Sequence, residues 1–477
     1  MSKKDILIIN PYLSDLIPRA GGWLPPLGIC YLDAYLKKHG YLSEIIDCTG
    51  QGIDHFDIRP LIISKSPRVV GISSTSPYIE RAVELAKIVK GISKDIVVIF
   101  GGYHATSLGK ELLEDVSEID IVVRGEGEET FLELADLYIN QQGSLDKISG
   151  ITFLNMGKIQ KNVDRNKIEN LDQLPFPTRD CVFYPNYDMP TKWNFKKPFA
   201  TIITSRGCPF NCIFCDIQSM MGRSVRFRNV EDITLEIKEL IHKYEIRDII
   251  FYDDTLTVSK KRILELCDRI INEKLNISWG CYSRVNAIDN EIALKMKQAG
   301  CRMISFGVES GSDFILEKMK KGIKAEDSIN AVKICKKHGI ETSVSTILGF
   351  PGETRETMKI TKDFLLKLNP LFVTVFPLIP YPGTILYEKY LKQNRIDRLP
   401  IPAFIELGEV RSLKIDGLSS QEINKSVFDI YKKFYFRPKK LLEHFIRVIT
   451  NRNLIRSYVL AVYWLFLQKI HKNGVLK

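Results

Sequence analysis

The sequence lacks any long apolar run, although 45% of its 477 residues are hydrophobic. No stretch approaches the roughly 18 residues that a membrane-spanning helix needs. The opening residues lead straight into the apolar segment 6–9, which is too short for the core of an export signal. Together with 26% charged residues, these features are typical of a globular chain of two or three domains.

Histidine is scarce, and several familiar catalytic motifs are missing. The seven histidines are too dispersed to suggest a metal cluster or a catalytic triad. The chain contains neither a Gly-x4-Gly-Lys-Ser/Thr phosphate loop nor a His-Glu-x-x-His zinc motif. P-loop nucleotide hydrolysis and zinc-dependent proteolysis are therefore not expected.

Cysteine is present ten times, but only three cysteines are clustered. Cys208, Cys212 and Cys215 lie in Ser-Arg-Gly-Cys-Pro-Phe-Asn-Cys-Ile-Phe-Cys. The remaining seven lie singly in apolar or helical segments, a pattern typical of free thiols in a reducing cytoplasm.

The spacing of the three clustered cysteines predicts an iron–sulfur site. Four cysteines would saturate a 4Fe–4S cluster, so three thiolates in one tight loop leave one iron open to another ligand. A structural zinc site needs four protein ligands, and no second cysteine pair is present to complete one. The alternative is that the three are small buried apolar residues.

The first 150 residues alternate short β-branched runs with segments of helical periodicity. Strands are predicted at residues 5–10, 43–47, 68–73, 95–100 and 120–124. Strands that alternate with helices indicate a parallel, doubly wound sheet, which binds ligands at the carboxyl ends of its strands.

Small residues follow three of these predicted strands. Ser73, Ser74 and Thr75 lie at the end of one strand, Gly101 and Gly102 follow the next, and Gly125 and Glu126 follow the last. Small side chains at neighbouring strand ends let a bulky ligand approach the backbone. Glycines at such positions are also ordinary turn formers.

A proline-rich connector at residues 160–198 precedes a second β/α series. Six strands are predicted there, at residues 200–204, 248–252, 277–282, 303–308, 341–348 and 371–377. The cysteine loop directly follows the first of them. In barrels of parallel strands the chemistry lies at the carboxyl ends, so the position of the loop agrees with a catalytic site.

The cysteine loop resembles the cluster motif of radical S-adenosylmethionine (SAM) enzymes, in which the open iron chelates the amino and carboxylate groups of SAM. The order of elements is similar to the class with an N-terminal cobalamin-binding domain, over about residues 1–390. The resemblance implies an α/β chain with four parts. These are a Rossmann-like cobalamin-binding domain at 1–150, a linker at 151–198, a partial (β/α)6 barrel at 199–390 and a helical, basic C-terminal region at 391–477.

The same resemblance implies a set of SAM-binding residues at the strand ends of the barrel. They are Phe214, Asp253, Asp254, Arg284, Glu309, Ser310 and Gly349. For the two aspartates the alternative role is a helix N-cap, and Arg284 can equally be a surface arginine. Glu353, in Gly-Phe-Pro-Gly-Glu-Thr, is expected to cap the next helix.

The segments Pro-Pro-Leu-Gly and Gly-Gly-Tyr-His resemble cobalamin-binding domains of this class. The residues implied are Gly28, Ser73, Ser74, Thr75, Gly101, Gly102, His104, Gly125 and Glu126. The Asp-x-His-x-x-Gly motif that supplies a cobalt ligand in many cobalamin proteins is absent. His104 is therefore either a cofactor contact or a polar loop residue, and a domain that has lost cobalamin stays an alternative.

The resemblance implies that a 5′-deoxyadenosyl radical abstracts a hydrogen from an unactivated carbon, which then takes a methyl group from methylcobalamin. A second SAM would remethylate the cofactor, and a flavodoxin or ferredoxin would supply electrons. One alternative is an oxidative cyclase like the anaerobic magnesium-protoporphyrin ester cyclase. Another is a non-catalytic cobalamin or cluster sensor.

The basic character of the chain belongs to its C-terminal tail. Residues 432–477 contain eleven Lys or Arg and one acidic residue, a formal charge of +10 in a chain of +11. Basic residues interspersed with apolar ones, followed by the apolar run 458–467, favour contact with a membrane surface and an apolar substrate such as an isoprenoid lipid or tetrapyrrole. A helix packed on the barrel is the alternative. Nucleic acid is not expected, because RNA-binding aromatic motifs are missing. The chain is therefore expected in the cytoplasm, or peripheral at the inner face of the membrane.

Overall fold

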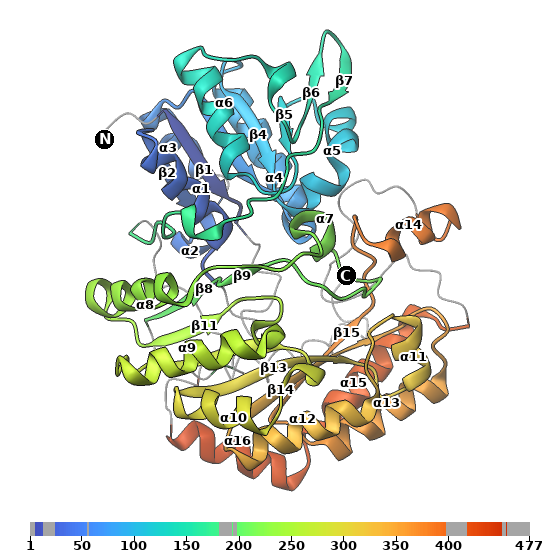
Figure 1. The fold of residues 1–477 in the computed structure, drawn as a ribbon. Helices are drawn as coiled ribbons and strands as arrows, with labels where there is room; N and C mark the ends of the chain where they lie inside the picture. Colours follow the sequence, from blue (N-terminus) through green and yellow to red (C-terminus); the bar gives the residue numbers. More distant parts are fainter. Residues whose placement is uncertain are drawn as a thin grey trace.

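The computed structural model describes residues 5–12, 24–54, 57–180, 193, 198–396, 417–450 and 455. Two units are visible in Figure 1, with the first sheet above, the second below and helix α7 between them. Cys181 and the apolar run 458–467 lie outside the described residues.

The first unit is a seven-stranded sheet in the order β2-β1-β3-β4-β5-β6-β7. Strands β1 to β5 are parallel, as the sequence predicts, and each lies within three residues of its predicted position. The strands are β1 (Ile6–Asn10), β2 (Ser43–Asp47), β3 (Val69–Ser73), β4 (Val97–Gly101), β5 (Ile121–Val123), β6 (Ile151–Asn155) and β7 (Lys158–Lys161). The helices are α1 (Leu27–Lys38), α2 (Cys48–Gln51), α3 (Ile58–Lys65), α4 (Ile79–Ile92), α5 (Tyr103–Asp115) and α6 (Glu128–Asn140).

Alternation along β1 shows why both faces of this sheet are covered. Ile6 and Ile8 belong to a core that continues into the second unit, whereas Leu7 and Ile9 belong to a separate core formed with α3 and α4. Successive strand residues point to opposite faces, so a run of four apolar residues needs an apolar layer on each side. The doubly wound arrangement is therefore confirmed.

The antiparallel hairpin β6–β7 was not predicted. It pairs with β5 and extends the first sheet into residues 151–161, within the range for which the sequence predicts a linker. After the hairpin, Leu171 and Leu174 pack with Leu27 and Tyr31 in a small third core. The connector is thus attached to the first unit over much of its described length.

The second unit is a six-stranded parallel sheet in which neighbours in space are neighbours in sequence, β8-β11-β12-β13-β14-β15. This order is that of a partial barrel. The strands are β8 (Phe199–Ile202), β11 (Asp248–Phe251), β12 (Ser278–Ser283), β13 (Cys301–Glu309), β14 (Glu341–Leu348) and β15 (Phe372–Pro377). A small pair, β9 (Ser205–Arg206) and β10 (Arg226–Phe227), flanks the cysteine loop.

The helices of the second unit follow its strands and cover the sheet. They are α7 (Ile217–Met221), α8 (Val230–Tyr244), α9 (Lys260–Asn272), α10 (Asn290–Gln298), α11 (Asp313–Lys318), α12 (Ala325–Lys337), α13 (Arg355–Leu368) and α14 (Ile385–Lys392). The six predicted strand positions are confirmed to within a few residues.

Helix α15 (Ser420–Tyr435) closes the open edge of this sheet. The Tyr431 hydroxyl accepts from the N–H of Val375 at 2.9 Å, and the Tyr435 hydroxyl accepts from that of Val373 at 2.9 Å. A helix rises about 6 Å over four residues, and a strand rises about 6.6 Å over two. Two tyrosines one turn apart therefore match two outward-facing groups of β15 and satisfy an edge that would otherwise be open.

Candidate active site

The three clustered cysteines lie in the loop between β9 and α7, at the carboxyl end of β8. All three side chains are partly exposed. The loop turns at Gly207, whose φ of +97° favours glycine and where an added Cβ would overlap the carbonyl oxygen of Ser224. The Cys208 N–H donates to the carbonyl of Gly222 at 3.3 Å, which ties the start of the loop to its end.

The donor set of this loop fits a cubane cluster. In the described part of the chain no group of three His, Cys, Asp or Glu side chains converges on a single metal ion. A 4Fe–4S cluster takes each thiolate on a different iron, so its cysteines do not need to converge. Burial raises the pKa of the Cys215 thiol to about 12. A bound metal would favour the thiolate against that cost.

Arg284 lies beside the cysteine loop, at the end of β12. Its Nη1 is 3.5 Å from the Cys212 sulfur, its guanidinium stacks 3.7 Å from the centroid of Phe210, and its Nη2 donates to the carbonyl of Lys321. Arg284 is 5% exposed, which rules out the surface alternative. A buried cation at this position offsets the negative charge of thiolates.

The two aspartates after β11 have different environments. Asp253 is buried, and its Oδ1 accepts from the Thr204 and Ser205 hydroxyls at 2.8 and 2.5 Å, so it holds the loop after β8. Asp254 is partly exposed. Burial, together with the carboxylates of Asp253 and Asp216, raises the pKa of Asp254 to about 7. Asp254 is therefore the better placed of the two to meet a ligand amine.

Glu309 and Ser310 close β13 but serve different partners. Glu309 has a φ of +59°, and its Oε1 forms a buried ion pair with Lys321 Nζ at 2.7 Å. The Ser310 hydroxyl is fully buried, lies 3.1 Å from the Thr361 hydroxyl and accepts from the Ser312 N–H. Ser310 thus supports the loop, whereas Glu309 and Lys321 form a charged pair near Phe214, whose ring centroid is 6.0 Å from Lys321 Nζ.

In the loop after β14, the expectation that Glu353 caps the next helix is wrong. The N-cap of α13 is Thr354, whose hydroxyl accepts from the Thr357 N–H at 3.2 Å, and not Glu353. Glu353 instead turns back and accepts from the N–H groups of Gly349 and Phe350. Burial raises the pKa of Glu353 to about 7. The carboxyl group therefore shapes the Gly349 loop that the resemblance assigns to SAM.

The carboxyl edge of the first sheet brings most of the predicted cobalamin residues together. The Ser74 N–H donates to the Gly101 carbonyl at 2.7 Å, and a Cβ on Gly102 would come within 2.6 Å of the Ser74 oxygen. A Cβ on Gly28 or Gly101 would meet nothing within 4 Å. The edge therefore combines tight backbone packing with open space for a ligand.

Buried polar atoms without a protein partner mark this edge. Within the described ranges, Thr75 Oγ1, Ser107 Oγ and His104 Nε2 have none. His104 is 3% exposed, its Nδ1 lies 3.0 Å from the Ser76 hydroxyl, and burial lowers its pKa to about 4. Buried polar groups are normally hydrogen-bonded, so these atoms fit a ligand such as cobalamin.

Glu126 takes part in the junction between the two units. Its carboxylate pairs with Arg206 at 2.7 Å and with Arg226 at 2.7 Å, and Arg206 also pairs with Glu128 at 2.6 Å. All four side chains are buried. Burial favours the neutral acid, but the two arginines hold the pKa of Glu126 below its usual value. Both of its oxygens are occupied within the protein, so a cobalamin contact of Glu126 stays a prediction without support from this geometry. Gly125 beside it has a φ of +76° and a Cβ there would lie 3.3 Å from Lys167 Nζ.

Helix α5, which follows the carboxyl edge of the first sheet, packs against α7, which follows the cysteine loop. Burial raises the pKa of the Tyr103 phenol, and the charges of Asp254, Asp216 and Cys215 raise it further. Tyr103 begins α5, directly after Gly102. The carboxyl edge of the first sheet and the cysteine loop are therefore neighbours.

Gly383 lies where three segments meet. It has a φ of +85°, and a Cβ there would collide with the Ser107 hydroxyl of α5 and approach Ser219 of α7 at 3.1 Å. The Tyr-Pro-Gly-Thr loop after β15 therefore packs against both units. Close approach explains its glycine, for which the sequence alone offered no role.

Sequence reasoning missed an aromatic cluster at the barrel mouth. Tyr252 and Tyr282 meet edge to face at 5.4 Å, and Trp193 meets Tyr282 at 5.3 Å. Tyr252, directly after β11, is 45% exposed. The apolar runs at β11 and β12 predict the strands but not which aromatic side chains lie at the mouth.

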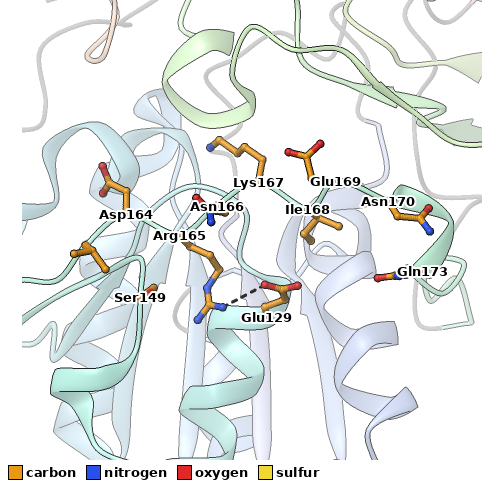
Figure 2. A pocket seen from close by; sticks show the side chains of 11 residues that line it. Glu129, Ser149, Asp164, Arg165, Asn166, Lys167, Ile168, Glu169, Asn170 and Gln173 are labelled. Atoms are coloured by element: carbon orange, nitrogen blue, oxygen red, sulfur yellow. Dashed lines mark hydrogen bonds and ion pairs between the residues drawn. The ribbon is translucent and has the colours of Figure 1, made fainter.

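A separate surface hollow of about 520 Å³ lies along the connector (Figure 2). Arg165 pairs there with Glu129 at 3.2 Å, and Lys167 and Glu169 lie on the side of α7. The described residues that line it include none of the predicted cluster or SAM residues. Its walls are charged and open, unlike the aromatic cluster at the barrel mouth.

Comparisons with known proteins agree with this geometry. Residues 202–365 match the radical SAM superfamily, and residues 14–135 match the B12 binding domain. An uncharacterized methyltransferase of Pyrococcus horikoshii is 36% identical over 468 residues, which cover 97% of this chain and 100% of that protein. The anaerobic magnesium-protoporphyrin IX monomethyl ester cyclase of Rubrivivax gelatinosus is 28% identical, covering 97% of this chain and 82% of its own.

A solved structure supports the fold. The cobalamin-dependent SAM radical enzyme OxsB, with aqua-cobalamin and SAM bound, superposes with a TM-score of 0.74 at 17% identity, over 98% of this chain and 75% of that one. No helix in the described ranges is long and apolar enough to span a bilayer. The predicted fold class, cofactors and enzymatic nature are confirmed, and a non-catalytic sensor is set aside. The chain belongs to the radical SAM enzymes with an N-terminal cobalamin-binding domain, which work with a 4Fe–4S cluster, SAM and cobalamin.

Proposed function

We propose that this enzyme methylates an unactivated carbon of an apolar small molecule. The observation that carries the proposal is the contact between the carboxyl edge of the first sheet and the segments around the cysteine loop. Glu126 pairs there with Arg206, two residues before Cys208, and Gly383 packs between Ser107 of α5 and Ser219 of α7. A methyl donor and a radical generator that share one space can act on one substrate in turn.

The residues of the chain have separable tasks in this proposal. When bound, the cluster with SAM supplies the 5′-deoxyadenosyl radical and cobalamin supplies the methyl group. Cys208, Cys212 and Cys215 hold the cluster, while Asp254, Arg284 and the Glu309–Lys321 pair surround the SAM space with charges of both signs. Hydrogen abstraction by a radical needs no general base, so the lack of a recognisable triad agrees with it.

An apolar substrate is supported by the aromatic side chains at the barrel mouth. Tyr252, Tyr282 and Trp193 form a continuous cluster there, and aromatic rings favour flat or extended apolar ligands. The cyclase relative is named for a magnesium-protoporphyrin ester, a large flat molecule. We propose a lipid, isoprenoid or tetrapyrrole as the substrate class.

The second candidate function is oxidative cyclisation without methyl transfer. It is favoured by one observation, the 28% identity with the cyclase across nearly the whole chain. Both reactions use the same cofactors, so the geometry of the cluster loop does not separate them.

Two further proposals concern partners. A flavodoxin or ferredoxin would reduce the cluster, whose loop is partly exposed. Residues 432–477, with their charge of +10, would bring the enzyme to a membrane surface where apolar substrates gather.

The test uses anaerobically reconstituted enzyme, dithionite, SAM with a deuterated methyl group, and an apolar extract of host cells that lack the gene. We expect an extract component to gain a deuterated methyl group while 5′-deoxyadenosine accumulates. Cys212→Ala is the control and should give neither product. Loss of hydrogens without label would favour the cyclase, and an unchanged extract with no 5′-deoxyadenosine would contradict both.

A further inference from the structure

Helix α16 (Pro438–Thr450) turns its charged side toward the barrel. Lys440 is 2% exposed and donates to the carbonyl of Pro370 at 2.6 Å, and Arg447 pairs with Glu341. His444 packs between Phe372 and Tyr435, with centroids 5.3 and 5.6 Å away. Residues 440, 444 and 447 follow helical spacing, so one polar stripe faces inward.

The opposite stripe of α16 is apolar and faces outward. Leu442, Phe445, Ile446 and Ile449 are 59%, 61%, 52% and 59% exposed, and they share one face because they lie three or four residues apart. Surface helices normally bury the apolar stripe and expose the polar one. A helix with the reverse arrangement therefore presents a surface made for an apolar environment.

Exposed lysines lie on α16 itself and on neighbouring helices. Lys432, Lys433 and Lys439 are exposed on α15 and α16. Lys336 of α12 is also exposed. Burial lowers the pKa of Lys440, the charge of Lys336 lowers it further, and Glu443 opposes the shift. An apolar centre with a cationic rim is complementary to anionic headgroups above acyl chains.

We infer that the outward face of α16 is a docking surface for an anionic lipid bilayer. The inference sharpens the membrane contact proposed above and does not depend on the chemistry of the active site. Four outward residues define it: Leu442, Phe445, Ile446 and Ile449.

The chemistry of the tail favours lipid over a cover from within the chain. Residues 458–467, Tyr-Val-Leu-Ala-Val-Tyr-Trp-Leu-Phe-Leu, contain no charged residue, and the polar side-chain atoms are those of two tyrosines and one tryptophan. Against α16 they would cover its apolar stripe with one side and leave the other side in need of an apolar environment. A bilayer surface accommodates both segments, and Arg452, Arg456, Lys469 and Lys472 flank the run where headgroups would lie.

The docking face lies away from the active site. Lys440 and Arg447 contact Pro370 and Glu341, which stand at the starts of β15 and β14, whereas the cysteine loop lies at the carboxyl ends. Figure 1 shows α16 at the base of the barrel and the first unit above its top. The surface therefore anchors the enzyme, and the mouth of the barrel faces away from the bilayer beneath it.

The test is flotation of the full-length protein with vesicles of equal parts phosphatidylcholine and phosphatidylglycerol, and with phosphatidylcholine alone. We expect the protein to float with the anionic vesicles, and less so as salt is raised. Leu442→Asp combined with Phe445→Asp should lower the bound fraction about tenfold. Leu294→Asp with Phe314→Asp, at 46% and 53% exposure on α10 and α11, is the matched control and should bind normally.

Four results would overturn the inference. One is failure of the unaltered protein to float with anionic vesicles, and another is equal binding of both double variants. A third is an α16 double variant that melts far below its control without lipid, which would mean that the chain covers the face itself. The fourth is a dimer that this variant splits. Flotation needs no turnover, so none of these results bears on methyl transfer.

Discussion

The two ends of the barrel bury charged side chains in opposite ways. At the upper end, Arg206 and Arg226 meet Glu126 and Glu128, and this closed network holds the first unit against the cysteine loop. At the lower end, Arg447 of α16 meets Glu341, whose side chain is 41% exposed. Buried charges at the top join two units of the protein, and those at the bottom orient a helix whose other face is apolar.

The ion pairs at the upper end hold two units of the protein together, whereas the ion pair at the lower end orients a docking helix. A buried network whose members are all paired is rigid, and it is costly to break because removal of one partner leaves an uncompensated charge. A pair that water reaches on one side loses much less when it is broken. We therefore expect single substitutions at the catalytic end to lower the free energy of unfolding strongly. Substitutions at the docking end should change stability little but weaken membrane binding.

The largest effect is expected at the cysteine loop. Cys212→Ala should abolish both the iron–sulfur absorption of anaerobically reconstituted protein and the formation of 5′-deoxyadenosine, because the cluster loses one of its three ligands. Cys335→Ala, at a buried cysteine of α12 outside the loop, is the control and should keep its iron. Equal iron content in the two variants would contradict the assignment of the cysteine loop as the cluster-binding site.

The junction network should give the next largest effect. Glu126→Ala leaves Arg206 and Arg226 buried with one carboxylate fewer, and we expect a loss of about 3–5 kcal/mol in the free energy of unfolding. The comparison is Glu341→Ala at the docking end, where a partly exposed partner is removed and about 1 kcal/mol is expected. Urea titration measures both. Similar losses for the two would show that the ends do not differ.

The Glu353 carboxyl should make stability depend on pH. Its folded-state pKa, about 7, lies above the ordinary value of 4.5, so the folded protein favours the neutral acid. Stability from this group is full below pH 4.5 and falls as pH rises toward 7. Glu353→Gln lacks this loss and should become more stable than the parent as pH rises, by up to about 3 kcal/mol. Melting curves at pH 5 and 8 of protein without cofactors test the sign, and parallel shifts in both proteins would contradict it.

A smaller effect than those of the Cys212, Glu126 and Glu353 substitutions is expected at the closed edge of the second sheet. Tyr435→Phe removes the hydroxyl that accepts from the Val373 N–H and donates to the Val373 carbonyl. We expect a loss of about 1–2 kcal/mol in the free energy of unfolding, since the backbone groups lose partners. Hydrogen exchange at Val373 should also become faster. An unchanged exchange rate there would show that the tyrosine does not protect the edge.

Local patterns were enough to predict the strands and the cluster loop. Runs such as Ile6–Asn10 are β-branched and bounded by polar residues, so period and length indicate buried strands directly. The cysteine spacing is equally local, because all three ligands lie within eight residues. The hairpin β6–β7 was missed because its second strand, Lys158–Lys161, is short and polar.

Roles that depend on distant partners could not be predicted in this way. Glu126 follows a strand end and resembles a ligand contact, but its partners Arg206 and Arg226 are 80 and 100 residues away. Tyr103 belongs to the segment Gly-Gly-Tyr-His in the sequence, and the packing of α5 beside the cysteine loop depends on how the two units meet. The reversal of α16 depends on Pro370 and Glu341, which the helix sequence does not contain.

The most direct measurement of the central claim is electron paramagnetic resonance of protein that holds both the cluster and cobalamin. If the cobalamin edge and the cysteine loop share one space, the Co(II) signal should relax faster and broaden once the cluster is reduced. Protein with Cys212→Ala should show the unperturbed Co(II) signal. A Co(II) spectrum that is the same with and without a reduced cluster would contradict a shared site.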